Sequence, residues 1–359
     1  MELINNQFQN IDMNVKEKFK LKIGYLANIF GVNRVLRFAF RRNILVIMYH
    51  GVTAKNYKPA AWTQLPINIF EEQIKWLLKN YTPVSLSHVV DAVANGSVLP
   101  DNSVLLTFDD GLKNNISVAY PVLEKYKFPA AIFLTVDLVD TEFFLWFDEL
   151  YIIIKEAKEK GIKLELSLSK AKAYFEQGRY WEAYCAEVEH LKRKPLKDCL
   201  QIVTNMLNQI SYEKQKYCED FGPLSWQDVI TLDKKGLVEF GVHTATHRIL
   251  TTIPETQLED ELLGAKNRLE KQLGHKVDTF CYPNGSLGRD YLPEHRYMLK
   301  EFGYKCAFAT DLGLYDLQRD NEFSIPRIAV GNDISAKADF FQMNASGLCN
   351  LRTLIQKHM

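Results

Sequence analysis

Two polar clusters in this 359-residue sequence carry the residue types that hydrolytic metal sites use. In the first, Asp109 and Asp110 follow an apolar run and are followed by a glycine. In the second, His243 and His247 lie four residues apart, directly after another short apolar run. One carboxylate and two imidazoles suit a catalytic zinc ion with an open coordination position, and the remaining carboxylate can act as a base.

Each cluster also has a structural alternative. An Asp-Asp-Gly sequence is common in turns, where the carboxylate accepts a backbone hydrogen bond. Two histidines at positions i and i+4 share one face if their segment is helical, and such a pair is often an ordinary surface feature. The apolar runs before both clusters favour the functional reading, because residues that follow a buried strand lie where α/β folds place their catalytic groups.

Strands alternate with helices along most of the chain, from about residue 43 onward. This β-α-β rhythm predicts an α/β fold with a parallel sheet or barrel of about seven strands. The predicted strands are 44–48, 103–108, 130–134, 238–242, 279–282, 306–309 and 324–328. The predicted helices are 69–78, 86–94, 116–126, 257–273, 293–301 and 336–342.

The rhythm is interrupted between residues 141 and 222, where Leu, Ile and Met recur at helical spacing. We therefore divide the chain into an N-terminal helical segment at 1–42, a barrel at 43–140 and 223–345, and a helical insertion at 141–222. The insertion begins with several aromatic residues between 143 and 151. These either stack on sugars, enter lipid or pack in a core, and the sequence leaves the choice open.

Both clusters resemble the first two motifs of the NodB-type polysaccharide deacetylases, carbohydrate esterase family 4. The resembling segments are Thr-Phe-Asp-Asp-Gly at 107–111 and His-Thr-Ala-Thr-His at 243–247. The likeness extends to Met-Tyr-His-Gly-Val at 48–52, Phe-Pro-Ala-Ala-Ile-Phe-Leu at 128–134 and Phe-Cys-Tyr-Pro-Asn-Gly at 280–285. It covers about residues 43 to 335, without the insertion.

The resemblance implies a distorted (β/α)7 barrel of the NodB type that carries a helical insertion. It implies that Asp110, His243 and His247 hold a divalent metal, with zinc as the expected ion. It also implies that Asp109 is the general base that takes a proton from the attacking water. The backbone N–H of Asn284, in the third motif, would then donate a hydrogen bond to the developing oxyanion.

Two positions depart from the family pattern. Cys281 stands where an arginine often orients the base, and no histidine follows in the last motif at 324–329 to act as the acid. Arg327 is the candidate replacement for the orienting residue, or a substrate contact, with a structural salt bridge as the alternative. His50 is the candidate acid or substrate ligand, with a hydrogen-bonded histidine at the core edge as the alternative.

Three further residues flank these motifs and are predicted substrate contacts. They are Tyr49, Tyr282 and Pro283.

Charge is balanced over the whole chain, with 44 basic and 44 acidic residues, so no global field favours nucleic acid. Residues 14–42 are different, because eight basic residues alternate there with apolar ones. The segment is either a solvated helical face or a peripheral contact with an anionic membrane. The sequence shows no secretory pattern and no membrane span, and its six scattered cysteines suggest reduced thiols. We therefore expect a cytoplasmic protein, peripheral at the inner face of the membrane.

These observations lead to one function and two alternatives. The leading hypothesis is a metal-dependent hydrolase that removes N-acetyl groups from amino sugars of a polysaccharide, a lipopolysaccharide or a lipid-linked glycan precursor. One alternative is a barrel without catalysis that binds a glycan or a partner. The other is an amidohydrolase that acts on a non-sugar amide.

Overall fold

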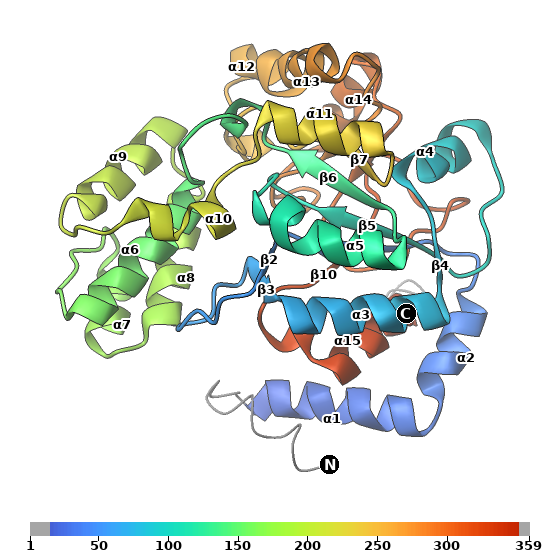
Figure 1. The fold of residues 1–359 in the computed structure, drawn as a ribbon, viewed down its shortest axis with the longest axis horizontal. Helices are drawn as coiled ribbons and strands as arrows, with labels where there is room; N and C mark the ends of the chain where they lie inside the picture. Colours follow the sequence, from blue (N-terminus) through green and yellow to red (C-terminus); the bar gives the residue numbers. More distant parts are fainter. Residues whose placement is uncertain (1–14, 352–359) are drawn as a thin grey trace.

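The computed structural model describes residues 15–351, so residues 1–14 of the predicted N-terminal segment lie outside the described range. A curled sheet lies at the centre with helices around it, and the insertion extends from one side (Figure 1). This arrangement is the α/β barrel that the sequence predicts, with a helical insertion.

Parallel strands form the central sheet in the order β10-β1-β5-β6-β7-β8-β9, and β4 pairs with β5. β1, β5, β6, β8 and β9 are buried along their whole length, which explains why they appear as continuous apolar runs. Residues alternate between the two faces of the sheet. Leu45 and Ile47 pack with the surrounding helices, whereas Val46 packs in a second cluster with Phe133 and Phe308. The strands are β1 (Leu45–Tyr49), β4 (Thr82–Pro83), β5 (Ser103–Phe108), β6 (Ala130–Leu134), β7 (Val238–Val242), β8 (Thr279–Cys281), β9 (Cys306–Phe308) and β10 (Ile328–Ala329).

The segment 325–329 joins the two ends of this sheet. Ile325 forms a parallel bridge with Phe308 of β9, and β10 pairs with β1. The predicted strand 324–328 is therefore mostly wrong, because only Ile328 and Ala329 have regular strand pairing. Pro326 interrupts the segment, since proline has no N–H to donate to a neighbouring strand.

Helices pack around the sheet, and all of them lie close to predicted positions except the helix at residues 226–235, which was not predicted. A π-helical turn at Asn115–Ala119 precedes α5, and another at Asp260–Gly264 joins α12 to α13. A small parallel pair, β2 (Gly51–Thr53) with β3 (Gln64–Pro66), follows β1. The helices are α3 (Ile67–Asn80), α4 (Leu86–Asn95), α5 (Tyr120–Tyr126), α11 (Trp226–Lys235), α12 (Glu255–Glu259), α13 (Ala265–Leu273), α14 (Pro293–Glu301) and α15 (Ala338–Ala345).

The insertion is helical and has a hydrophobic core of its own. Leu150, Ile154, Leu191, Val203 and Met206 belong to this core, which contains no residue of the barrel strands. The insertion helices are α6 (Trp146–Lys160), α7 (Ser169–Glu176), α8 (Tyr180–Leu191), α9 (Leu196–Leu207) and α10 (Cys218–Phe221). They stand beside the sheet in Figure 1, on the side where β2 and β3 lie.

Two helices precede the barrel, α1 (Val15–Ile29) and α2 (Val32–Ala39). Gly31 separates them with a left-handed backbone (φ 69°). α1 lies against α15, and Asn28 donates a hydrogen bond to Asp339 at 2.6 Å. None of the helices within residues 15–351 has the length and apolarity needed to cross a membrane.

Candidate metal centre and active site

The three predicted metal ligands lie close together beyond the carboxyl ends of β5 and β7, the two strands that flank β6. Asp110 follows β5, and His243 follows β7. The Nε2 atoms of His243 and His247 lie 3.5 and 3.1 Å from Oδ1 of Asp110. Asp110 and His243 are buried, and His247 is almost so. One ligand atom from each residue lies within 4.8 Å of the others, a spacing that a single ion can bridge.

The two histidines are brought together by a turn. A helix was considered for this segment from its sequence, and the structure shows that it is not helical. Thr244 and His247 have left-handed backbone conformations, with φ of 62° and 59°. Asp110 does as well, with φ of 74°. Non-glycine residues rarely adopt this conformation, and they do so mainly at functional sites where the surroundings hold them.

Glu261 provides that support for the histidine turn. Its carboxylate accepts hydrogen bonds from the backbone N–H groups of Ala245 and Thr246, each at 3.0 Å. It also accepts a hydrogen bond from the hydroxyl group of Thr246. Glu261 is buried on the helical segment that follows the turn, and the sequence analysis did not single it out.

The chemistry of this cluster fits a divalent cation. Neither carboxylate oxygen of Asp110 has a hydrogen-bond partner among the described residues, although both are buried. A buried carboxylate without a partner is costly, and a bound cation would compensate its charge. Burial lowers the pKa of His243 to about 4, so its imidazole is neutral, as a metal ligand must be. Its Nδ1 lies 2.8 Å from the carbonyl oxygen of Cys281, which directs Nε2 toward Asp110.

Asp109 is held by a different partner. Nη1 and Nη2 of Arg327 donate to the two carboxylate oxygens at 2.7 and 2.8 Å, and both residues are buried. Burial alone would raise the pKa of Asp109, but the guanidinium outweighs it and the pKa lies below its ordinary value. Asp109 also lies near His243 and Cys281, in a second group with ligand-like spacing. Its oxygens are already engaged by Arg327, so Asp110 is the better metal ligand.

Arg327 is itself fixed by several contacts. It donates to the carbonyl of Ala309 at 2.8 Å and to the hydroxyl of Thr107 at 3.2 Å. Its Nη2 also lies 3.0 Å from Sγ of Cys281, and that thiol lies 3.6 Å from both oxygens of Asp109. Burial raises the pKa of the Cys281 thiol well above its usual value, so the thiol is neutral beside the ion pair. Cys281 thus leaves space for an arginine that arrives from another part of the chain.

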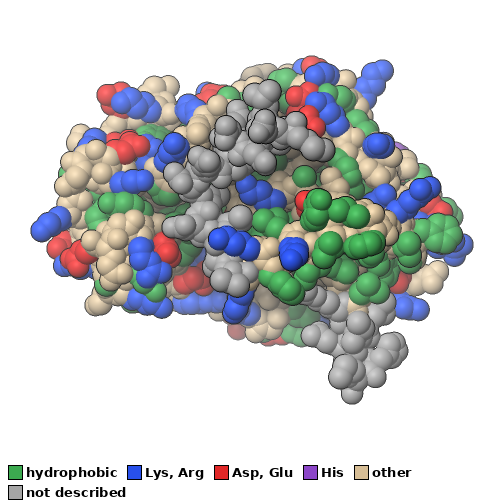
Figure 2. All heavy atoms as spheres, turned by 90° about the horizontal axis from the view of Figure 1, so that it is seen from below, with side chains coloured by type: hydrophobic (Ala, Val, Ile, Leu, Met, Phe, Trp, Pro, Cys, Tyr) green, Lys and Arg blue, Asp and Glu red, His purple; other side chains and the backbone are tan. Residues whose placement is uncertain are grey.

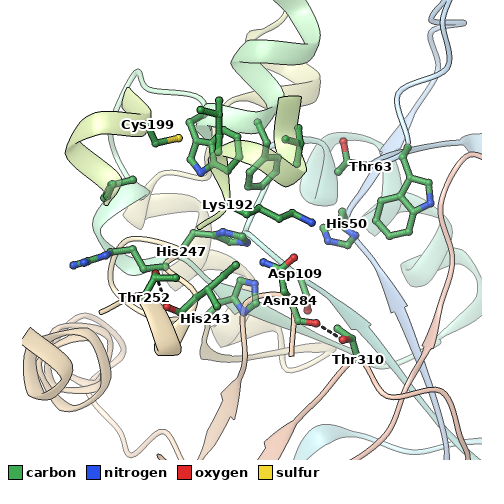
Figure 3. A pocket seen from close by; sticks show the side chains of 18 of the residues that line it. His50, Thr63, Asp109, Lys192, Cys199, His243, His247, Thr252, Asn284 and Thr310 are labelled. Carbon is green, nitrogen blue, oxygen red and sulfur yellow. Dashed lines mark hydrogen bonds between the residues drawn. The ribbon is translucent and has the colours of Figure 1, made fainter. Parts of the chain in front are cut away.

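His50 and Asn284 lie at the same pocket as Asp109, and Figure 3 shows their side chains around it. Nδ1 of His50 is buried and has no hydrogen-bond partner within residues 15–351, and its ring packs against Trp62. Asn284 has a left-handed backbone (φ 61°), and its carbonyl accepts a hydrogen bond from Thr310. None of the described residues accepts a hydrogen bond from the backbone N–H of Asn284.

The structure does not bring the other three predicted residues to the pocket. The hydroxyl of Tyr49 donates to Gln73 at 2.7 Å, and that of Tyr282 donates to the carbonyl of Phe323 at 3.0 Å. Both rings are fully buried in the core, where Tyr282 stacks on Tyr291. Pro283 is buried next to Asn284 but does not line the cavity. The side chains of these three residues therefore do not line the pocket, and their predicted role as substrate contacts gains no support from the fold.

The pocket has a volume of about 350 Å³, and the insertion supplies one of its walls. Trp146 and Phe147 come from α6, and Val188 and Leu191 come from α8. Of the aromatic residues at the start of the insertion, Phe144 and Tyr151 instead belong to a buried cluster. The sequence gives no signal for this wall, because nothing local to the insertion indicates which face meets the barrel.

Asp148 of α6 is a further buried carboxylate at this contact. It accepts a hydrogen bond from Thr63, a residue that lines the pocket, at 3.2 Å. Burial, and next the charge of Asp110, raise the pKa of Asp148 well above its ordinary value. Asp148 was not singled out from the sequence.

Known proteins resemble this chain in sequence. A 60-residue segment is 40% identical to poly-beta-1,6-N-acetyl-D-glucosamine N-deacetylase of Escherichia coli K12, covering 16% of this chain and 9% of that protein. A 158-residue segment is 30% identical to the Staphylococcus aureus N315 protein of the same name, covering 44% of this chain and 51% of that protein. The matches therefore span between about a tenth and a half of these relatives.

Solved structures resemble it in fold. Streptococcus pyogenes deacetylase PplD in complex with acetate aligns with a TM-score of 0.54 and 18% identity, covering 82% of this chain and 95% of that one. IcaB from Ammonifex degensii aligns with a TM-score of 0.53 and 18% identity, covering 85% and 97%. The family model for polysaccharide deacetylase matches residues 96–307, which is more than half of the 359-residue chain. This chain therefore belongs to the polysaccharide deacetylase family.

Proposed function

We propose that this protein is a divalent-metal-dependent hydrolase that removes the N-acetyl group from an amino sugar of a glycan or of a glycan precursor. One observation carries the proposal. The unpartnered carboxylate of Asp110 and the imidazoles of His243 and His247 lie within ligand distance of one another, next to a second carboxylate that lines a pocket. That combination supports hydrolysis better than binding alone, because buried charges are costly to keep without a use.

Asp110, His243 and His247 would hold the cation, and two imidazoles with one carboxylate favour zinc. When bound, the ion would polarise the acetamide carbonyl and acidify the attacking water. Asp109 would accept the proton from that water. Arg327 orients both of its oxygens and keeps the carboxylate ionised. The products would be acetate and the free amine of the sugar.

Two further residues would assist the reaction. The free backbone N–H of Asn284 lies at the pocket and would donate to the oxygen that becomes negative during attack. His50, whose Nδ1 has no other partner, would donate the proton that the leaving amine needs. Acetamide is hydrolysed only if both the carbonyl oxygen and the amine nitrogen are stabilised, so the two roles are complementary.

Acetate release tests this function. The zinc-loaded protein is incubated with N-acetylglucosamine oligomers, nucleotide-linked and lipid-linked N-acetyl sugars, and non-sugar acetamides. We expect Asp109→Asn to keep its metal and to lose turnover by about 10²- to 10⁴-fold, the usual contribution of a general base. Asp110→Ala should instead lose the metal. Metal-loaded protein that releases no acetate from any sugar would refute the proposal, and turnover of only the non-sugar amides would favour the amidohydrolase alternative.

We also propose that the protein works at the cytoplasmic face of a membrane, which it contacts through α1 and α2. Ile29, Phe30, Val35 and Phe38 project into solvent there, with Phe30 and Phe38 exposed to 75% and 69%. Figure 2 views the molecule from below and shows hydrophobic side chains gathered on this face with Lys and Arg beside them. The exposed basic residues of the two helices are Lys16, Lys18, Lys20, Lys22 and Arg34, and Arg42 is exposed in the turn that follows α2. Apolar side chains rimmed by cations are suited to an interface of anionic lipids.

Cosedimentation with lipid vesicles tests this contact. The protein should bind vesicles that contain anionic lipid, less strongly at high salt, and should not bind neutral vesicles. A Phe30→Ser/Phe38→Ser variant should lose binding, while Val98→Ser, at another exposed apolar residue, should not. Equal binding by the two variants, or no binding by the wild type, would exclude α1 and α2 as the contact.

A further inference from the structure

The wall that the insertion contributes to the pocket is mainly apolar. Val188, Leu191 and Leu196 line it together with the aromatic residues Trp146, Phe147 and Tyr184. Aromatic rings can stack on sugars, but aliphatic side chains cannot satisfy sugar hydroxyl groups, which would lose their hydrogen bonds on burial. This half of the pocket is therefore suited to an apolar part of a ligand.

A second cavity continues from this wall. It has a volume of about 920 Å³ and runs between α9 and the segment that leads from β6 into α6. Trp146 and Leu196 line both cavities, so the groove and the pocket meet at these two residues. Most of the groove is apolar, with Leu138, Phe143, Leu200, Leu207 and Ile210 along it. Phe143 and Leu200 are exposed, which is unusual for large apolar side chains beside a cavity.

Cations lie in the pocket between the metal ligands and this apolar wall. Lys192, Lys194 and Arg248 line the pocket, and Lys192 and Lys194 belong to the short connection between α8 and α9. Figure 3 shows the side chain of Lys192 reaching over the site toward His50. Asp109 is the one acidic residue among the described residues that line the pocket, and Arg327 neutralises it. Lys192 also pairs with Glu189 at 2.6 Å, and Arg248 lies 3.7 Å from Glu261. Lys194 has no ion pair among the described residues, so an anionic group of a substrate would meet Lys194 first and would compete with Glu189 for Lys192.

We propose that the substrate is an N-acetylated amino sugar joined through phosphate to a long apolar chain. The sugar would lie at Asp110, His243 and His247, the phosphate at Lys192 and Lys194, and the chain in the groove along α9. This inference rests on the proposed function and names its substrate class. A polysaccharide would leave the groove without a suitable occupant, and a nucleotide-linked sugar would use the cations but not the groove.

The first test compares one sugar in two forms. N-acetylglucosamine linked through diphosphate to a polyprenyl chain is assayed beside N-acetylglucosamine 1-phosphate, which has no chain. We expect a markedly lower KM for the form with the chain. Leu200→Asp should raise that KM by about tenfold or more, since it places a charge where methylene groups are buried. The same variant should leave turnover of the chainless sugar unchanged.

Matched controls distinguish an effect of the groove from the effect of the same substitution elsewhere on the surface. Leu312→Asp changes a leucine that is 55% exposed, compared with 47% for Leu200, and should affect neither substrate. Lys194→Ala should weaken both phosphate-bearing substrates, whereas Lys197→Ala, an exposed lysine in α9 that does not line the pocket, should not. Equal KM values for the two forms of the sugar, or a preference for chainless oligosaccharides, would overturn the proposal.

A binding measurement keeps this inference distinct from the proposed function. Polyprenyl phosphate without sugar is titrated into the zinc-loaded protein, with quenching of tryptophan fluorescence as the signal. Binding that weakens in Leu200→Asp and not in Leu312→Asp supports the groove even if no acetate is released from any sugar. Absence of binding by the wild type would show that the groove holds no lipid chain. A wild type that is dimeric in solution, with Leu200→Asp monomeric, would assign the groove to a second copy of the chain and would also overturn the proposal.

Discussion

The barrel and the insertion contribute different kinds of side chains to the pocket. The barrel buries polar groups at the ends of β5 and β7, where Arg327 neutralises Asp109 and two imidazoles lie within 3.5 Å of Asp110. The insertion has its own core and presents aliphatic and aromatic side chains to the pocket. The chemistry of the site thus depends on a few exact polar contacts, whereas the wall opposite depends on shape and apolarity. Changes in the two regions should therefore have different consequences.

The largest effect on stability is expected in the barrel, from Arg327→Met. The variant would leave the buried carboxylate of Asp109 without its partner, which costs about 3–5 kcal/mol of unfolding free energy. Urea denaturation measures this loss. The Asp109→Asn/Arg327→Met variant removes the unpaired charge and should recover much of the stability. Arg319→Met, at an arginine that is 76% exposed, should change it little. A double variant no more stable than Arg327→Met would contradict the buried ion pair as the cause.

The next effect is expected in the core of the insertion, from Met206→Ala. Met206 is buried, and truncation of a buried methionine costs about 2–5 kcal/mol. Because the two regions have separate cores, amide hydrogen exchange should accelerate in α6, α8 and α9 and not in β5, β6 and β7. Leu269→Ala, in α13 of the barrel, should give the opposite pattern. Equal acceleration everywhere would mean that the two regions unfold as one unit.

A smaller effect is expected from Glu261→Gln, which touches no metal ligand. Both backbone N–H groups of the turn donate to Oε2 of Glu261, and the hydroxyl of Thr246 donates to Oε1. Glutamine keeps only one of the two acceptor oxygens and loses the negative charge that strengthens these bonds. Outer-shell changes of this kind lower metal affinity by about 10- to 100-fold. Competition with a chromophoric chelator measures the affinity. Glu259→Gln, at an exposed residue of α12, is the control. Unchanged affinity would show that the turn does not need Glu261.

The smallest effect is expected where the two regions meet, at Asp148. Burial raises the pKa of this carboxyl in the folded protein, so ionisation disfavours folding. The wild type should therefore lose stability, relative to Asp148→Asn, as the pH rises above about 3.9, the value for an unfolded Asp. Thermal unfolding of the metal-free proteins at pH 4 and pH 7 should show a difference only at pH 7. Exposed Asp198→Asn should show no such difference, and parallel pH curves for Asp148→Asn would refute the argument.

Local sequence predicts the barrel well because its strands are buried on both faces. β5, β6 and β7 begin and end at the predicted residues, since continuous apolar runs bounded by polar residues leave little choice. The polar residues that follow these runs could be predicted to lie close together, because the carboxyl ends of parallel strands are at the same end of the barrel. The two-residue period of a strand places Tyr49 on the same face as Leu45 and Ile47, which packs under the helices. This pattern predicts a core position for Tyr49 and not a substrate contact.

Other parts of the site depend on contacts that no local pattern encodes. The left-handed backbone at Thr244 and His247 is imposed by Glu261 and its neighbours, so the sequence alone could not distinguish a turn from a helix there. The sequence also does not predict which side chains of the insertion line the pocket. An amphipathic pattern identifies the apolar face of a helix but not the surface against which that face packs. Arg327 could be proposed only because Cys281 occupies the position where an arginine is usual in this family.

The segment that closes the barrel has a consequence for how the protein matures. Ribosomes make the chain from its N-terminus, so Asp109, Asp110, His243 and His247 all emerge before Arg327. Arg327 arrives on the segment in which Ile325 bridges β9 and β10 pairs with β1. Asp109 thus gains its guanidinium partner in the same step that pairs β10 with β1. A nascent chain could bring Asp110, His243 and His247 together early, but Asp109 would be oriented only when almost all of the barrel has been synthesised.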